Sequence, residues 1–158
     1  MTLHEAHVID DYGGPDARAE ARAQDTEQCW QAVPEEDIRS PQAVLSFLDD
    51  EGFHYYIPAY IVWYVRNIDS EGPDDESNTF DSVIFHLTGL GEERLVERFE
   101  RFTTEQCRAI AHFLLFEAAR EEASKIAWMR ESLAKGGLSL EEVECTLRSH
   151  DFQKTPIR

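Results

Sequence analysis

Three histidines are the residues whose type and placement could build a metal or catalytic site. His54, His86 and His112 stand on three separate predicted helices, so tertiary packing could bring their imidazoles together. Such a site would also need a nearby carboxylate. Ordinary helix histidines, hydrogen-bonded or partly exposed, are the competing interpretation, and we favour it. A metal-binding protein or an enzyme that uses these histidines is therefore an alternative hypothesis.

Motifs that carry known chemistry are missing from the rest of the sequence. Gly89-Leu90-Gly91 lacks the third glycine and the lysine of a phosphate-binding loop. No serine is flanked by glycines as in a nucleophile elbow, and no Cys-x-x-Cys or His-Glu-x-x-His pattern occurs. We therefore expect no catalytic residue and no cofactor, and a binding protein rather than an enzyme.

Acidic residues concentrate in the first half of the chain. Residues 1–81 hold nineteen Asp and Glu against four Arg, and the remaining residues hold thirteen against eleven Arg and Lys. The first half thus carries −15 of the net charge of −17. A negative field of this size repels nucleic acid and anionic lipid and speeds the capture of a basic partner. The other interpretation, which we favour for the charge taken by itself, is that it only keeps the protein soluble.

A short acidic segment follows the most apolar stretch of the chain. Its acidic residues are Asp69, Glu71, Asp74, Asp75 and Glu76. Their spacing does not match an EF-hand loop, and Pro73 interrupts them, so we do not expect a calcium site. We predict that they steer a basic partner, with a merely solvated loop as the alternative.

Aromatic residues make up six of the twelve positions from 53 to 64. Four aromatic residues recur at helical spacing and share one face: Phe53, Tyr56, Tyr60 and Trp63. That face is either core or a binding groove, and we favour core. Tyr55 and Tyr64 fall off this face and are expected to be more exposed. If the run is an interface, its anchors are Tyr55, Tyr60, Trp63 and Tyr64.

The elements that carry these residues are predicted to be helices. Apolar residues recur at helical spacing in about six to seven segments without a convincing strand, which predicts an all-α, irregular helical bundle. Pro58 cannot donate its backbone hydrogen bond, so the aromatic helix should kink or break there. Thr103 and Gln106 form a capping-box pattern that should start a long helix. We expect an acidic, mobile segment over 1–24, a single helical domain over 25–149 and a loose tail over 150–158.

Composition indicates a cytoplasmic protein. The 158 residues contain three cysteines, an odd number without a close pair, which is typical of a reducing compartment. The most apolar stretch, residues 53–65, is too short to span a bilayer. No secretory leader is visible at the N-terminus. We therefore expect no membrane partner.

Two sequence blocks and one tryptophan carry a resemblance to a known family. The first block is residues 47–60, which end in the aromatic run Phe-x-Tyr-Tyr-Ile-Pro-Ala-Tyr at 53–60. The second is Arg-Phe-Thr-Thr-Glu-Gln at 101–106, followed by Ile110 and Phe113-Leu114. Together with Trp30, these blocks resemble a bacterial family known only as a domain of unknown function. The resemblance covers about residues 28–118. It implies a bacterial protein and supplies no catalytic residues.

These observations favour a non-catalytic, acidic module that binds another protein, a basic one in our hypothesis. Small, acidic, helical bacterial proteins of the cytoplasm include immunity proteins and antitoxins, which cover a basic partner. A nucleic-acid mimic, whose carboxylates stand in for phosphates, is a further alternative. Nothing in the sequence favours direct binding to nucleic acid.

Overall fold

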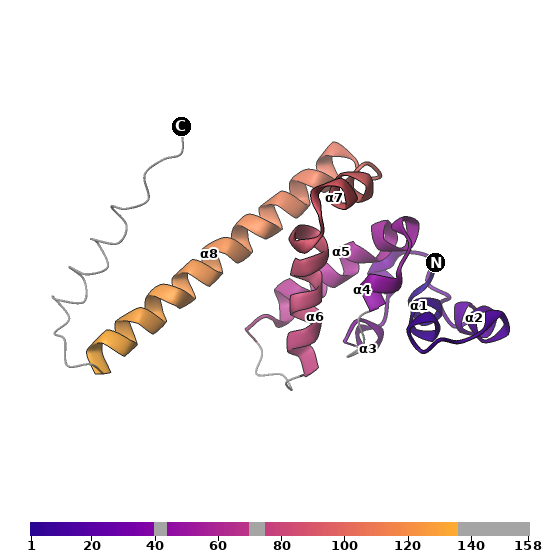
Figure 1. Ribbon diagram of the computed structural model, residues 1–158, viewed down its shortest axis with the longest axis horizontal. Coiled ribbons are helices and arrows are strands. Elements are labelled where there is room, and N and C mark those ends of the chain that lie inside the picture. Colours follow the sequence, from indigo (N-terminus) through magenta and orange to yellow (C-terminus); the bar gives the residue numbers. More distant parts are fainter. Residues whose placement is uncertain (40–43, 70–74, 136–158) are drawn as a thin grey trace. The chain divides into compact units, whose positions relative to one another are not determined.

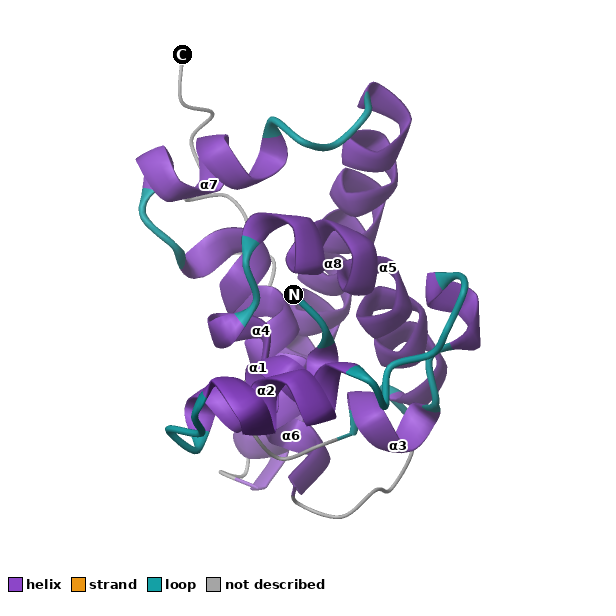
Figure 2. Cartoon of the chain, turned by 90° about the vertical axis from the view of Figure 1, so that its right-hand side faces the viewer, coloured by secondary structure: helices purple, strands orange, loops and turns teal. Residues whose placement is uncertain are grey.

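The computed structural model describes residues 1–39, 44–69 and 75–135 (Figure 1). Within these ranges all regular structure is helical and no strand occurs, which confirms the predicted all-α class (Figure 2). The eight α-helices of the described part are α1 (Leu3–Asp10), α2 (Pro15–Arg22), α3 (Glu35–Ile38), α4 (Val44–Phe47), α5 (Asp50–Asn67), α6 (Asp75–Ile84), α7 (Glu92–Phe99) and α8 (Thr104–Lys135). A short 3-10 turn, η1 (Trp30–Ala32), precedes α3, and a π-helix, η2 (Phe85–Gly89), continues α6.

The chain divides into two compact units, Met1–Ala109 and Ile110–Arg158. The first unit holds α1 to α7 and the start of α8, and the described part of the second is the remainder of α8. None of the described helices, the long α8 included, combines the length and apolar character that a bilayer crossing requires. The predicted domain limits at 25 and 149 stay predictions, and the predicted tail at 150–158 lies outside the described residues.

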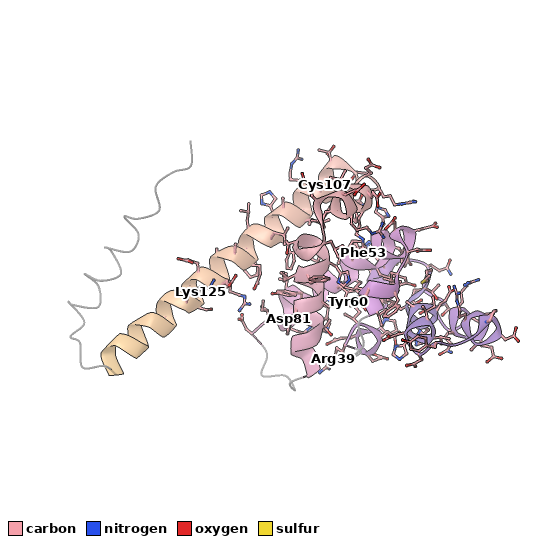
Figure 3. All side chains as sticks on the ribbon, in the orientation of Figure 1. Arg39, Phe53, Tyr60, Asp81, Cys107 and Lys125 are labelled. Atoms are coloured by element: carbon pink, nitrogen blue, oxygen red, sulfur yellow. The ribbon has the colours of Figure 1, made fainter. Side chains whose placement is uncertain are left out.

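α5 supplies much of the core of the first unit. Eight of its residues are buried: Gly52, Phe53, Tyr56, Ile57, Ala59, Tyr60, Trp63 and Tyr64. Figure 3 shows Phe53 and Tyr60 among the crowded side chains of this unit. The four aromatic residues that share a face by sequence spacing are all in this buried set, so their interpretation as core is confirmed.

α5 runs continuously through Pro58, so of the two outcomes predicted there, a kink or a break, the break does not occur. The helix starts at Asp50, because the Asp49 carboxylate accepts a hydrogen bond from the backbone N–H of Gly52 at 2.8 Å and caps the first turn. A proline inside a helix costs about 3 kcal/mol. Each large apolar side chain that α5 buries contributes about 1.5–3 kcal/mol, so several of them outweigh the proline.

The start of α8 matches its predicted capping box. The Gln106 backbone N–H donates to Thr103 Oγ1 at 3.2 Å, and the Thr103 backbone N–H donates to Gln106 Oε1 at 2.8 Å. These reciprocal bonds satisfy two backbone donors that the first turn of a helix leaves without partners. The prediction is therefore confirmed at the level of individual hydrogen bonds.

The acidic N-terminal segment contains two helices that pack together, and its predicted mobility stays a prediction. α1 lies beside α2 in both views (Figures 1 and 2). Leu3 and Ala6 of α1 and Ala21 of α2 are buried between the elements of this unit. The apolar surface of this hairpin is small, which is why hydrophobic periodicity does not reveal it.

One buried carboxylate joins the two helices of the hairpin. Glu5 of α1 is only 1% exposed, yet it accepts hydrogen bonds from two arginines of α2. Arg18 donates through Nε at 3.3 Å and Nη2 at 2.9 Å, and Arg22 through Nε at 2.9 Å and Nη2 at 2.6 Å. The hydrogen bond from Arg22 is the largest cause that lowers the pKa of Glu5, to about 2. Glu5 is therefore a charged group that the fold satisfies completely.

Tyr12 ends α1 in the left-handed backbone region, with a φ of 58°. The Gly13 N–H donates to the Val8 carbonyl at 2.7 Å and the Tyr12 N–H to the Ile9 carbonyl at 3.0 Å, which is a Schellman motif. Glycine is usual at this position, because a side chain there costs about 1–2 kcal/mol. Gly13 itself cannot carry a side chain, since a Cβ would collide with Val8. The strain of this turn is thus concentrated at Tyr12.

Glu5→Gln should destabilise the protein by about 2–3 kcal/mol at pH 7, because the neutral amide loses its charge-assisted bonds to both arginines. The lowered pKa gives the sign of the pH dependence. The stability that Glu5 contributes is present above pH 4.5 and is lost as the pH falls through about 2. Urea unfolding at pH 7 and at pH 3 measures both effects. Glu20→Gln, at an exposed position of α2, is the control, and an equal effect of the two variants would contradict the role of Glu5.

Tyr12→Gly should stabilise the protein by about 0.5–1 kcal/mol. Glycine removes the left-handed strain, and the larger entropy of its unfolded state offsets only part of that gain. Tyr12→Ala is the matched control, because alanine loses the ring but keeps the strained conformation. Chemical denaturation measures the free energy of unfolding of both variants. If Tyr12→Ala is as stable as Tyr12→Gly or more stable, the turn is not strained.

Candidate functional site

His4 on α1 lies between two aspartates, Asp25 and Asp37. Its Nδ1 lies 2.8 Å from Oδ1 of Asp25, and its backbone N–H donates to Oδ2 of the same residue at 3.0 Å. On the other side, Nε2 lies 3.7 Å from Oδ1 of Asp37 on α3. The Asp25 side chain is only 1% exposed and therefore has little contact with water. His4 supplies a polar partner to each of its two carboxylate oxygens instead.

The two aspartates set the protonation of His4. Burial lowers the pKa of His4, but the hydrogen bond and charge of Asp25 and the charge of Asp37 outweigh burial, so the pKa lies above 6.5. For Asp37, burial raises the pKa more than the nearby His4 lowers it. Asp37 is therefore a half-buried carboxylate whose pKa is raised mainly by burial.

A pocket of about 230 Å³ opens beside this arrangement. Its described lining consists of Leu3, His4, His7, Glu36, Asp37 and Val44. Leu3 and Val44 are buried and form the apolar part, while Glu36 is exposed. α3 supplies three acidic residues in its first turn, where the helix dipole favours negative charge. This combination of apolar surface and carboxylates suits a cationic group on a hydrocarbon stem.

The residues predicted to steer a partner are only partly described. Asp69 follows α5 and is exposed. Glu71 and Asp74 lie outside the described residues. Asp75 and Glu76 open α6, and their side chains also lie outside the described set. The steering role of this segment stays a prediction.

The predicted aromatic anchors belong mainly to the core. Tyr60, Trp63 and Tyr64 are each no more than 3% exposed, so they present no binding surface. The expectation that Tyr64 is exposed is wrong, because Phe80 of α6 packs edge-on against it with ring centroids 4.8 Å apart. Tyr55 is half-buried and donates its hydroxyl to the Glu27 carbonyl at 3.3 Å. The role of Tyr55 as an anchor stays a prediction.

Trp63 also borders a small hollow of about 80 Å³ between η1 and α5, together with Trp30 and Arg66. Its indole ring stacks on Phe80 at 4.9 Å. Its Nε1 is buried and has no hydrogen-bond partner among the described residues. Because that nitrogen is closed off from solvent, it offers no donor to a ligand.

The three candidate histidines have separate environments. His54 Nε2 lies 3.4 Å from Gln106 Oε1, whereas His112 belongs to the second unit. His86 is buried, its Nδ1 donates to the Ser82 carbonyl at 2.8 Å, and its Nε2 lies 3.2 Å from Ser46 Oγ. Among the described residues, no group of three or more His, Cys, Asp or Glu is placed to hold a metal ion. His54 and His86 therefore each make local hydrogen-bonding contacts.

Two features of this region escape sequence reasoning. The pairing of His4 with Asp25 and Asp37 joins residues 21 and 33 positions apart, so no local pattern indicates it. Tyr12 is the one tyrosine of the sequence that lies outside the aromatic run, and it is 96% exposed. The Gly13-Gly14 pair signals the helix end but does not show which residue takes the left-handed conformation.

Comparison with known proteins identifies the family. The model of a family described as "Family of unknown function (DUF6714)" matches residues 1–135, and the chain belongs to this family. The matched range is wider than the resemblance at 28–118 and includes the N-terminal hairpin and the pocket beside it. No match was found among curated proteins or among solved structures.

His4 and His86 should titrate on opposite sides of pH 6.5. The pKa of His86 is lowered mainly by burial and also by the charge of Arg98, although its bond to the Ser82 carbonyl raises it. The stability linked to His4 is present below pH 6.5 and is lost as the pH rises through its folded pKa. The stability linked to His86 is present above pH 6.5 and is lost as the pH falls through its folded pKa.

NMR titration of the histidine ring protons measures both pKa values. Asp37→Asn should lower the pKa of His4 by roughly half a unit and leave that of His86 in place. Asp69→Asn is the control, because it makes the same change at an exposed residue that is not among the charges acting on His4. A His86 that titrates above His4 would contradict this account of the site.

Proposed function

We propose that this protein is a non-catalytic, acidic module that binds a basic protein, and that the pocket beside α1 receives a basic side chain of that partner. The observation that carries the proposal is the lining of the pocket, where Glu36 and Asp37 lie next to buried apolar side chains. A lysine or arginine places its hydrocarbon stem on such apolar surface and its charge on the carboxylates.

The size of the pocket supports a protein partner over a cofactor. Small-molecule sites occupy about 300–1,000 Å³, and a pocket of about 230 Å³ falls below that range. It accommodates a single side chain of a larger partner. The charge of −15 in residues 1–81 would draw such a partner from a distance and orient it before contact.

The biological class we propose is a bacterial, cytoplasmic protein of the immunity or antitoxin kind, which masks a basic partner. The acidic first half and the lack of catalytic motifs support this class. The acidic segment that begins at Asp69 is proposed to add to the steering field, since Asp69 is exposed. In this scheme the pocket holds the partner, and the more distant carboxylates raise the association rate.

Affinity capture from the native host, with tagged protein at low and at high salt, tests the proposal. We expect one basic protein to be retained at low salt and depleted at high salt. Glu36→Lys reverses a charge in the pocket and should abolish that retention. Glu100→Lys makes the same charge change at an exposed position after α7 and should keep it. With the captured protein purified, Glu36→Lys should lower the association rate constant by about tenfold and flatten its salt dependence.

Two results would overturn the proposal. Equal losses in Glu36→Lys and Glu100→Lys would show that only net charge matters. Retention that does not depend on salt would show that the acidic surface plays no part in binding.

A further inference from the structure

Ser46 and His86 form a hydrogen-bonded pair that the proposed function does not use. Ser46 lies on α4 and is exposed, whereas His86 lies on the π-helix η2 and is only 3% exposed. Ser46 Oγ is 3.2 Å from His86 Nε2, although the two residues are 40 positions apart in the chain. π-helical turns are rare and occur frequently at functional sites. The fold thus joins an exposed serine to a buried imidazole.

The backbone carbonyl of Ser82 determines which imidazole nitrogen carries a hydrogen. His86 Nδ1 lies 2.8 Å from this carbonyl oxygen, which can only accept a hydrogen bond, and the Ser82 hydroxyl is farther away at 3.4 Å. Nδ1 must therefore carry a hydrogen, so in the neutral imidazole the free lone pair is on Nε2. Because Nε2 is then an acceptor, the hydroxyl of Ser46 donates its hydrogen to it.

His86 also has the protonation state that a base requires at neutral pH. Burial is the largest cause that lowers its pKa below 6.5, and the charge of Arg98 lowers it further, although the bond to the Ser82 carbonyl raises it. Arg98 lies against the Phe53 ring, whose centre is 6.4 Å from that of the His86 ring, and 3.8 Å from Asp50. The imidazole is therefore mainly neutral at pH 7 and can accept a proton.

This arrangement is the one that activates a serine hydroxyl. A nucleophile lies within hydrogen-bond reach of a base, and a third group orients the base through its other ring nitrogen. In this protein the third group is a backbone carbonyl instead of a carboxylate. Because a carbonyl has no full negative charge, it stabilises the imidazolium less, and we expect proton transfer to be slower than in a triad that contains an aspartate.

We propose that Ser46 is an acyl-acceptor site, with His86 as its base, for an activated carboxylic ester whose leaving alcohol or phenol is weakly basic. Ser46 Oγ forms a bond with the ester carbonyl carbon, and the bond between that carbon and the leaving oxygen breaks. The hydroxyl proton passes to His86 Nε2 and from there to the departing oxygen. The chain itself keeps the acyl group, so the step needs no turnover, and the inference does not rest on the proposed function.

Acetylation of the full-length protein by p-nitrophenyl acetate tests the proposal. Peptide mapping by mass spectrometry measures the rate at which each serine gains an acetyl group. Ser124 is the internal control, because it is exposed and its hydroxyl donates to the Arg120 carbonyl instead of to a histidine. General-base assistance contributes about 10²–10⁴-fold, so Ser46 should react at least roughly a hundredfold faster than Ser124. Equal rates at the two serines, or no acetyl group at Ser46, would overturn the inference.

The pH dependence of the same reaction separates a base from a structural hydrogen bond. The rate at Ser46 should rise as His86 loses its proton and then level off, because only the neutral imidazole accepts the hydroxyl proton. The midpoint should coincide with the pKa of His86 from the NMR titration, below 6.5. A rate that only increases in proportion to hydroxide, as expected for an unassisted serine, would contradict the role of His86.

Two histidine variants complete the test. His86→Asn keeps a neutral polar side chain that cannot take up the proton, and it should slow the acetylation of Ser46 by roughly a hundredfold. His54→Asn is the matched control and should leave the rate in place, since His54 contacts Gln106. An unchanged rate in folded His86→Asn would refute the base. If circular dichroism shows that His86→Asn does not fold, the pH profile and the comparison with Ser124 decide the question in the native protein.

Discussion

The N-terminal surface of this protein depends on one buried carboxylate. Glu5 accepts four hydrogen bonds from Arg18 and Arg22, which stand four residues apart on α2. Two donors one helical turn apart fix both the distance and the rotation of α2 against α1. The buried apolar contribution of α2 to this contact is a single alanine, Ala21, which cannot specify a unique orientation. The wall of the pocket on α1 and the turn at Tyr12 therefore inherit their geometry from this ionic cluster.

Arg98 of α7 is a second buried charged residue. Unlike Glu5, it does not have hydrogen-bond partners for all of its polar atoms. Its guanidinium carbon lies 4.0 Å from the centre of the Phe53 ring, and its Nε lies 3.8 Å from Asp50 Oδ1. Nε and Nη1 have no hydrogen-bond partner among the described residues. Burial is the main cause that lowers the pKa of Arg98, and it is also the main cause that lowers the pKa of the nearby His86. The buried Arg98 guanidinium thus has the Phe53 ring and a long ion pair with Asp50, and not the complete set of hydrogen bonds that Glu5 has.

Local features of the fold could be predicted from the sequence, and long-range ones could not. The two partners of the capping box, Thr103 and Gln106, are only three residues apart, so a local sequence pattern reveals both of them. The buried face of α5 follows from helical spacing alone. Tyr64 departs from that spacing and is still buried, because Phe80 of α6 covers a second face of the helix. Periodicity detects one buried face, and the burial of another depends on which helix packs there.

The candidate site was harder to predict for the same reason, since His4 meets Asp25 and Asp37 only after the hairpin has formed. Sequence reasoning placed the binding aromatics on α5, where aromatic residues are dense. A high density of aromatic residues is, however, also typical of a hydrophobic core. In α5 the burial of these large rings offsets the free-energy cost of Pro58 inside the helix. The pocket beside α1, by contrast, is lined by residues of α1, α3 and α4, which no single periodic pattern brings together.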